Sequence, residues 1–189
     1  MAYEIIRDIF KADYTSESDG EKIYFDERHC VKLMYGSSGQ QEALWILMLS
    51  FIIILEKKKS FVIVEEPEAH LFPIAQKKVV DLIALMVNTT GSKAIITTHS
   101  PYILTSLNIL LYSDKVEKSL KGKAVIPKSL RIPFDTFAAY KLENLADTRE
   151  SMENLLDEES HMIRTDYIDE VSSISNAELE RLLDRELGE

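Results

Sequence analysis

The chain has few of the features that mark secreted or membrane proteins. Its 189 residues include one cysteine, Cys30, which excludes an internal disulfide and suits a reducing compartment. The opening Met-Ala-Tyr-Glu has no basic segment leading into an apolar run, so it is not typical of a secretory signal. The apolar run from Leu44 to Leu55 is short for a transmembrane span and predicts a buried helix. We therefore expect a cytoplasmic protein.

Basic clusters are equally scarce. Residues 141–189 hold 5 basic and 15 acidic side chains, so this tail carries the whole net charge of -10. Because phosphate backbones are bound through Lys and Arg clusters, the acidic tail argues against non-specific nucleic-acid binding by this segment. The only basic run, residues 57–59, is interpreted as a solvated helix end.

The length suits one domain with a substantial core, and the hydrophobic periodicity predicts a mixed α/β chain. A loop is expected over 15–21, followed by a hairpin of strands 22–25 and 30–34. The other predicted strands are 61–64 and 93–98, both buried, with weaker edge strands at 109–112 and 123–126. The predicted helices are 3–11, 43–55, 73–88, 102–107 and, in the acidic tail, 176–187.

Two carboxylates follow directly after the buried strand at 61–64. Glu65 and Glu66 lie at its C-terminal end, and Pro67 prevents further strand pairing. In open α/β sheets, ligands bind beyond the carboxyl ends of the strands. One acid is therefore suited to a metal ion and the other to an attacking water, although a surface turn with two glutamates fits the same pattern.

The strand at 93–98 ends in His99. A helix joins it to the strand at 61–64, which predicts a right-handed βαβ unit with parallel strands. Such a unit places His99 on the same sheet edge as Glu65 and Glu66. Taken alone, His99 before Ser-Pro also fits a helix cap.

A turn of small residues precedes the apolar helix at 43–55. Ser37, Ser38 and Gly39 leave backbone N–H groups accessible at a helix N-terminus, which is a suitable anion site. Plain N-capping by Ser38, with Glu42 in the first turn, is the structural alternative.

These three motifs, in this order, resemble the C-terminal half of an ABC-type ATPase domain. The resemblance covers about residues 30–112 and is closest to the OLD-like branch of the AAA/ABC ATPases, related to the RecF and SMC group. It implies a partial P-loop NTPase fold, with a mostly parallel sheet flanked by helices. It also implies a homodimer that uses ATP and Mg²⁺.

The resemblance assigns a role to each motif residue. It implies that Glu66 is the general base for the attacking water, that Glu65 supports Mg²⁺ through water, and that His99 is the switch histidine that contacts the γ-phosphate. In the family, the signature motif caps the γ-phosphate bound by the opposite subunit, and the D-loop crosses the dimer interface. The signature corresponds here to Ser37, Ser38, Gly39 and Gln40, and the D-loop to Pro67, Glu68, Ala69 and His70.

One family motif is absent from the sequence. None of the six glycines begins the P-loop pattern G-x-x-x-x-G-K-[ST], which supplies the amide cradle, the phosphate-binding lysine and the Mg²⁺-binding hydroxyl. The chain should therefore not hold MgATP well by itself. Absence of the part of the domain that carries the P-loop should also expose apolar surface from the strand at 61–64. We expect residues 1–142 to form the C-terminal half of an ATPase domain whose site is completed by a P-loop lobe, and 143–189 to form an acidic helical tail.

Two other functions fit the same residues less well. A transition-metal site formed by Glu65, Glu66 and His70 lacks the usual ligand spacing. A non-catalytic interaction or dimerisation module, in effect a pseudo-ATPase fragment, would fold as a stable unit and never bind nucleotide.

Overall fold

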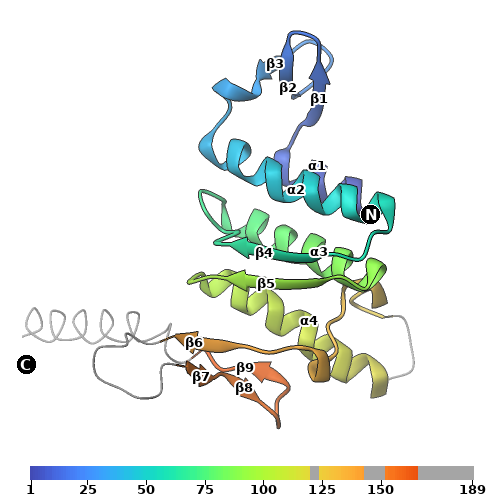
Figure 1. Cartoon of the computed structure of the whole chain (residues 1–189), viewed down its shortest axis with the longest axis vertical. Coiled ribbons are helices and arrows are strands. Elements are labelled where there is room, and N and C mark those ends of the chain that lie inside the picture. Colours follow the sequence, from blue (N-terminus) through green and yellow to red (C-terminus); the bar gives the residue numbers. More distant parts are fainter. Residues whose placement is uncertain (120–123, 143–151, 166–189) are drawn as a thin grey trace, which may run out of the picture. The chain divides into compact units, whose positions relative to one another are not determined.

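The computed structural model describes residues 1–119, 124–142 and 152–165, which divide between two compact units, Met1–Thr136 and Phe137–Glu189 (Figure 1). Unit 1 contains helices α1 (Ala2–Phe10), α2 (Ser38–Glu56), α3 (Pro73–Thr90) and α4 (Pro101–Ser119), strands β1 (Asp13–Glu17), β2 (Gly20–Tyr24), β3 (Cys30–Lys32), β4 (Phe61–Glu65) and β5 (Lys93–Thr97), and short 3-10 turns at Leu33–Tyr35, Lys128–Leu130 and Phe134–Thr136. Unit 2 contains β6 (Tyr140–Leu142), β7 (Met152–Asn154), β8 (Leu156–Asp157) and β9 (Met162–Ile163). The predicted boundary at 142 falls a few residues beyond the division at Thr136.

Helix α3 is the centre of unit 1. It packs against α1, α2 and α4 and against β5, and its residues from Val79 to Met86 are buried without interruption. The helix begins at Pro73, whose missing N–H costs nothing in the first turn, and ends at Gly91, whose φ of 68° closes it in the left-handed conformation. The predicted helix over 73–88 is confirmed and extends two residues further.

Strands β4 and β5 form the predicted parallel βαβ unit with α3 as the crossover. Their register pairs Phe61 with Lys93 and Glu65 with Thr97, so both strands end at the same edge. The other strand pairs in the described residues are antiparallel, and so the parallel arrangement is limited to this one pair.

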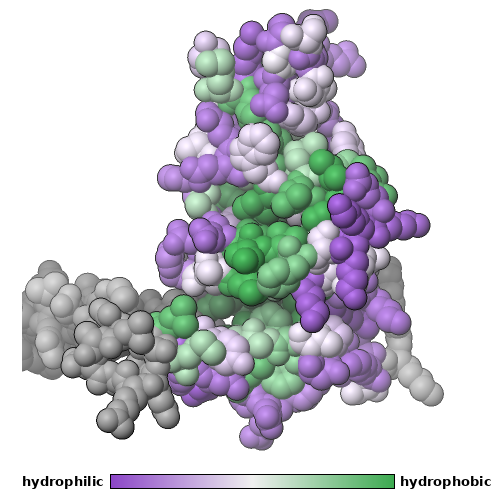
Figure 2. Space-filling model, in the orientation of Figure 1, coloured by the Kyte–Doolittle hydropathy of each residue, from purple (hydrophilic) through white to green (hydrophobic). Residues whose placement is uncertain are grey.

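The prediction that β4 is buried on both faces was wrong. Its alternate side chains face two environments: Val64 is buried, whereas Phe61 and Ile63 are 63% and 60% exposed. On β5, Ile95 is exposed as well. Figure 2 shows hydrophobic side chains gathered on this face over β4 and β5, and also over α2. Parallel sheets are normally covered on both sides, so the outer face of this sheet lacks its usual cover.

Helix α2 is apolar on more than one side. By length and composition alone it could cross a membrane, although core helices meet the same criterion. Leu44, Leu47 and Ile53 face the core of unit 1. A second stripe is exposed at helical spacing and consists of Trp45, Leu49, Ile52 and Leu55. A helix that is hydrophobic all round is normally buried all round, whereas this side of α2 is exposed.

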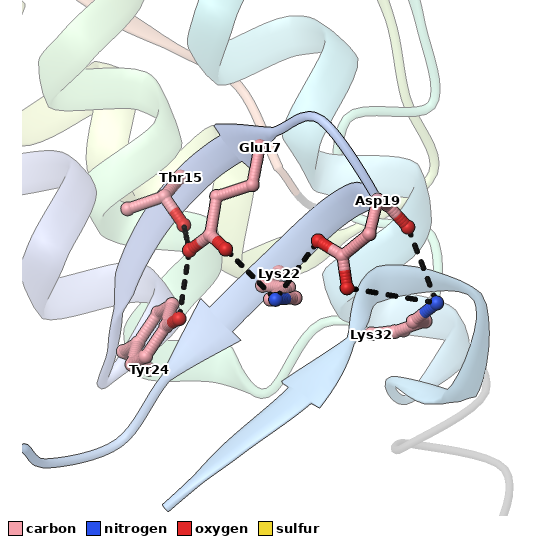
Figure 3. Close-up of polar contacts among 6 residues, drawn as sticks. All are labelled: Thr15, Glu17, Asp19, Lys22, Tyr24 and Lys32. Atoms are coloured by element: carbon pink, nitrogen blue, oxygen red, sulfur yellow. Dashed lines mark hydrogen bonds and ion pairs between the residues drawn. The ribbon is translucent and has the colours of Figure 1, made fainter. Parts of the chain in front are cut away.

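The segment predicted as a loop over 15–21 is a hairpin. Strands β1 and β2 pair antiparallel from Asp13–Tyr24 to Glu17–Gly20, and β3 extends the sheet. Polar cross-strand contacts replace the apolar alternation that normally identifies strands, which is why the pattern was missed. Lys22 Nζ bridges the carboxylates of Glu17 at 2.8 Å and Asp19 at 2.9 Å (Figure 3). Glu17 also accepts hydrogen bonds from the hydroxyl groups of Tyr24 and Thr15. Asp19 in turn contacts the side chain of Lys32.

This ion cluster should make the hairpin sensitive to acid. Hydrogen bonds from Lys22 lower the pKa of Glu17 and of Asp19. Carboxylates with lowered pKa values stabilise the fold above their unfolded pKa, and that stabilisation is lost as the pH falls through the folded pKa. We therefore expect Lys22→Met to lower the melting temperature at about pH 7. The gap to wild type should close as the pH falls through the lowered pKa values of Glu17 and Asp19.

Circular dichroism melting of both proteins across that pH range measures the gap. The control is Lys58→Met, since Lys58 is exposed and the structure shows it no carboxylate partner among the described residues. A gap for Lys22→Met that stays constant with pH contradicts the assignment of its stability to the two carboxylates.

Two predicted edge strands are not strands. Residues 109–112 continue α4, because Leu107, Leu110 and Leu111 are buried at helical spacing on the helix that begins at Pro101. Residues 124–126 are irregular, with Val125 exposed, and Lys123 lies outside the described residues.

The described residues of unit 2 form two short antiparallel pairs, β6 with β7 and β8 with β9. The helical tail predicted for 143–189 is therefore wrong over 152–165. Side-chain carbonyl groups there accept backbone hydrogen bonds two residues on, Asn154 from Leu156 at 3.0 Å and Asp157 from Glu159 at 2.9 Å. Such Asx turns compete with helix formation. The predicted helix at 176–187 lies outside the described residues.

Candidate active site

The end of β4 and the end of β5 bring the predicted acid and imidazole together. Because Glu65 and Thr97 are paired in the parallel register, Glu66 and His99 leave the sheet at the same edge. Glu66 Oε1 lies 3.2 Å from His99 Nε2. This is hydrogen-bonding distance between a base and an imidazole, the contact that the strand order predicts.

Glu66 has an unusual backbone conformation. Its φ of 44° is left-handed, which is unfavourable for a residue with a side chain. The conformation is held because the Glu66 N–H donates to the carbonyl oxygen of Thr97 at 2.9 Å and to the Thr97 hydroxyl at 3.3 Å. Strained residues of this kind are concentrated at active sites, where surrounding contacts maintain them. Glu66 is therefore distinguished from its neighbour Glu65, which completes β4 in ordinary strand geometry.

The pair is open to solvent in this structure. The His99 side chain is 77% exposed and that of Glu66 is 53% exposed, and Glu65 is exposed as well. Charged groups act most strongly on a reacting centre when water is excluded from it. Solvent therefore weakens the electrostatic effect of this pair on any group that lies next to it.

The turn before α2 caps the helix. Ser37 is the N-cap: its hydroxyl accepts from the Gln40 N–H at 3.3 Å, and the Gln40 side chain accepts from the Ser37 N–H at 3.1 Å. This is a capping box. The structural alternative of N-capping is therefore present, with Ser37 and not Ser38 as the capping residue. Ser38 is the first residue of the helix and is exposed.

The same turn contacts the segment after β4. Gly39 is buried against the backbone of His70: a Cβ at Gly39 would lie 2.4 Å from the His70 carbonyl oxygen. Next to it, His70 Nε2 lies 3.5 Å from Glu42 Oε1. The residues predicted as signature and as D-loop are thus neighbours within one chain. Only glycine permits this approach of α2 to the loop.

One loop residue was misjudged from sequence. As members of the D-loop, Glu68 and His70 are predicted to be surface residues. Glu68 instead lies partly buried and accepts hydrogen bonds from Thr98 and His99, and Pro67 beside it is fully buried. A glutamate at a turn carries no sequence signal of such a contact, because its partners are 30 residues away.

Comparison with known protein families gives one match to this chain. A family model described as an AAA ATPase domain matches residues 3–104, more than half of the chain. The chain belongs to the AAA ATPase domain family. The matched part of this AAA ATPase domain runs from α1 to the start of α4 and includes the capped turn, the Glu66–His99 pair and the loop between them. No curated protein and no solved structure matches the chain significantly.

The residues fit one part of what a Mg²⁺-nucleotide requires. The carboxylates of Glu65 and Glu66 are hard oxygen ligands of the kind that Mg²⁺ takes. Among the described residues, no group of three or more His, Cys, Asp or Glu side chains is placed to hold a metal ion by itself. The two glutamates are thus of a chemical type suited to the surroundings of a Mg²⁺ ion, and the sequence contains no G-x-x-x-x-G-K-[ST] pattern.

Proposed function

We propose that this chain is the hydrolytic half of a composite ATP hydrolase of the OLD-like branch, whose site is completed by a P-loop lobe that the sequence lacks. The observation that carries the proposal is the contact between Glu66 and His99 at the carboxyl edge of the parallel β4–β5 pair. The family match supports an ATPase function for the domain. ATP and Mg²⁺ would bind only with the added lobe.

Each residue has a role suited to its position. Glu66 orients and deprotonates the attacking water, and His99 donates a hydrogen bond to the terminal phosphate. In the present structure the Glu66 carboxylate and the His99 imidazole contact each other. Release of their contact frees Glu66 Oε1 to accept a proton and frees the imidazole of His99 to donate. Bound Mg²⁺ would polarise the phosphate, with Glu65 holding one of its water ligands.

The signature role is a further part of the proposal. Ser38, with Ser37, Gly39 and Gln40, would cap the γ-phosphate of a second subunit, which makes the active assembly a homodimer. In the present structure the side chains of Ser37 and Gln40 serve the capping box, so the backbone N–H groups at the start of α2 are the groups suited to an anion.

The uncovered apolar surface supports a missing lobe. We call it the open apolar face; it consists of Trp45, Leu49, Ile52 and Leu55 on α2 and of Phe61, Ile63 and Ile95 on β4 and β5. A two-stranded parallel sheet with one bare face is marginal alone, and parallel sheets are normally extended and covered on both sides. A lobe that extends this sheet and packs apolar side chains against its outer side would bury the face (Figure 2).

Reconstitution of hydrolysis tests the proposal. We expect the chain alone to show no Mg²⁺-dependent ATP hydrolysis, because it has no P-loop. With a P-loop lobe supplied in cis or in trans, hydrolysis should appear and should depend on Mg²⁺. The lobe alone is the control. Hydrolysis by the combination that does not exceed that of the lobe alone contradicts the proposal.

The second candidate function is a non-catalytic interaction module, and the open apolar face favours it too. In that case a second copy covers the face and nucleotide never binds. Light scattering of the chain alone and calorimetry of the combined protein with MgATP separate the two functions. A dimer without nucleotide binding in the combined protein supports the module, and a clean monomer counts against self-association.

A further inference from the structure

One carboxylate oxygen of Glu68 joins the loop after β4 to the segment that leaves β5. Glu68 Oε1 accepts a hydrogen bond from the Thr98 hydroxyl at 2.7 Å and another from the His99 backbone N–H at 3.0 Å. Both donors belong to the segment that leaves β5. The Glu68 carboxylate therefore binds the backbone of His99, the residue whose imidazole contacts Glu66.

The Gln76 side chain also connects the loop after β4 to the segment after β5. Gln76, on the first turns of α3, accepts from the Ser100 hydroxyl at 2.6 Å through Oε1 and donates to the Leu71 carbonyl oxygen at 2.8 Å through Nε2. Gln76 and Ser100 are both buried. Residues 66–71 are thus tied to residues 98–100 at both ends, by Glu68 on one side and Gln76 on the other.

The His99 imidazole has little packing of its own. Its side chain is largely exposed, so its place relative to Glu66 depends on where the backbone of residues 98–100 is held. That backbone is fixed by Glu68 and, one residue on, by the Ser100 N–H donating to the Thr98 hydroxyl at 3.0 Å. The Thr98 hydroxyl therefore joins Glu68, to which it donates, to the backbone of Ser100, from which it accepts.

The position of the Glu68 carboxylate is energetically unfavourable in one respect. Its second oxygen, Oε2, is buried and accepts no hydrogen bond from the described residues. A buried carboxylate oxygen without a donor is unfavourable, and an exposed glutamate in this turn would avoid the penalty. The position is explained by what the other oxygen does, namely hold Thr98 and His99.

We propose that Glu68 is a positioning residue for the Glu66–His99 pair. It sets the distance between the imidazole and the base through the main chain of His99, and touches neither the imidazole nor any reacting atom. The consequence for hydrolysis rests on the proposed function, but the positioning itself is a property of this chain and is measured without nucleotide.

Three variants separate positioning from general stability. Glu68→Ala removes the acceptor and leaves the His99 N–H without its partner. Glu68→Gln keeps an accepting oxygen of the same reach. Thr98→Val removes the hydroxyl at nearly constant shape, which loosens the contact from the other side. The matched control is Glu56→Gln, at the exposed end of α2.

The experiment is nuclear magnetic resonance on the isotope-labelled 189-residue chain. We expect Glu68→Ala to raise the hydrogen-exchange rate of the His99 amide by about tenfold or more and to weaken the nuclear Overhauser contact between the His99 imidazole and the Glu66 side chain. Thr98→Val should weaken the same contact. Glu68→Gln should restore both readouts, and Glu56→Gln should match wild type.

Two results would overturn the proposal. One is a Glu68→Ala protein in which the His99 amide and the imidazole contact are unchanged. The other is a uniform loss of protection throughout the chain in both Glu68 variants, which is the behaviour of a merely structural residue. If Glu68→Ala does not fold, Thr98→Val decides by the same criteria. Loss of the pair in these spectra with normal hydrolysis in the combined protein would refute the proposed role of the pair while leaving the positioning intact.

Discussion

Turnover by the composite hydrolase is expected to fall by about 10²–10⁴ when Glu66 is changed to Gln, with nucleotide binding retained. Gln has the same shape and keeps an oxygen near His99, but it cannot take a proton from water. Its backbone can keep the hydrogen bonds to Thr97 that hold Glu66 in its left-handed conformation. The substitution therefore removes the base and leaves the local fold.

Single-turnover hydrolysis and calorimetry with MgATP measure the two quantities separately. Glu56→Gln is the matched control, because it makes the same chemical change on an exposed helix end away from the pair. Unchanged turnover in Glu66→Gln refutes the assignment of the base. Loss of binding and turnover together assigns Glu66 to holding the nucleotide and not to attack by water.

The central part of the fold could be predicted because its signals are local. Apolar runs bounded by Pro73 and Gly91 define α3, and the two strands beside it have the composition of parallel strands. The strand pattern alone does not reveal the cover of the sheet, because Ile63 and Ile95 look the same in sequence whether a neighbour covers them or not. The absence of the P-loop motif did predict apolar exposure at 61–64, which Phe61 and Ile63 confirm. The β1–β2 hairpin was missed for the opposite reason, because its strands are held by polar pairs around Lys22.

The site divides in the same way. The meeting of Glu66 and His99 follows from strand order, because parallel strands joined by a helix must end at one edge. The contacts of Glu68 and Gln76 do not follow from any pattern, since each joins residues far apart in the chain through one side chain. The capping residue was misplaced by one, at Ser38 instead of Ser37, because both serines satisfy the same preference.

Gly39→Ala is expected to lower the free energy of unfolding by about 1–3 kcal/mol, the usual cost of overpacking. The new Cβ would lie 2.4 Å from the His70 carbonyl oxygen and 3.2 Å from its carbonyl carbon. In a free helix the same change would be stabilising by up to about 1 kcal/mol, so the sign of the effect reports the contact. The loop cannot easily yield, since Glu68 and Gln76 tie it to the end of β5.

Ser38→Ala is the control for Gly39→Ala. It lies in the same first turn of α2, is exposed, and gains helix propensity without meeting the loop. Urea denaturation followed by circular dichroism compares the two variants with wild type. A Gly39→Ala protein as stable as Ser38→Ala would show that α2 and the loop do not approach this closely. A stable Ser38→Ala beside a destabilised Gly39→Ala would show that α2 packs directly against the backbone of the loop before α3, the loop that begins at Glu66.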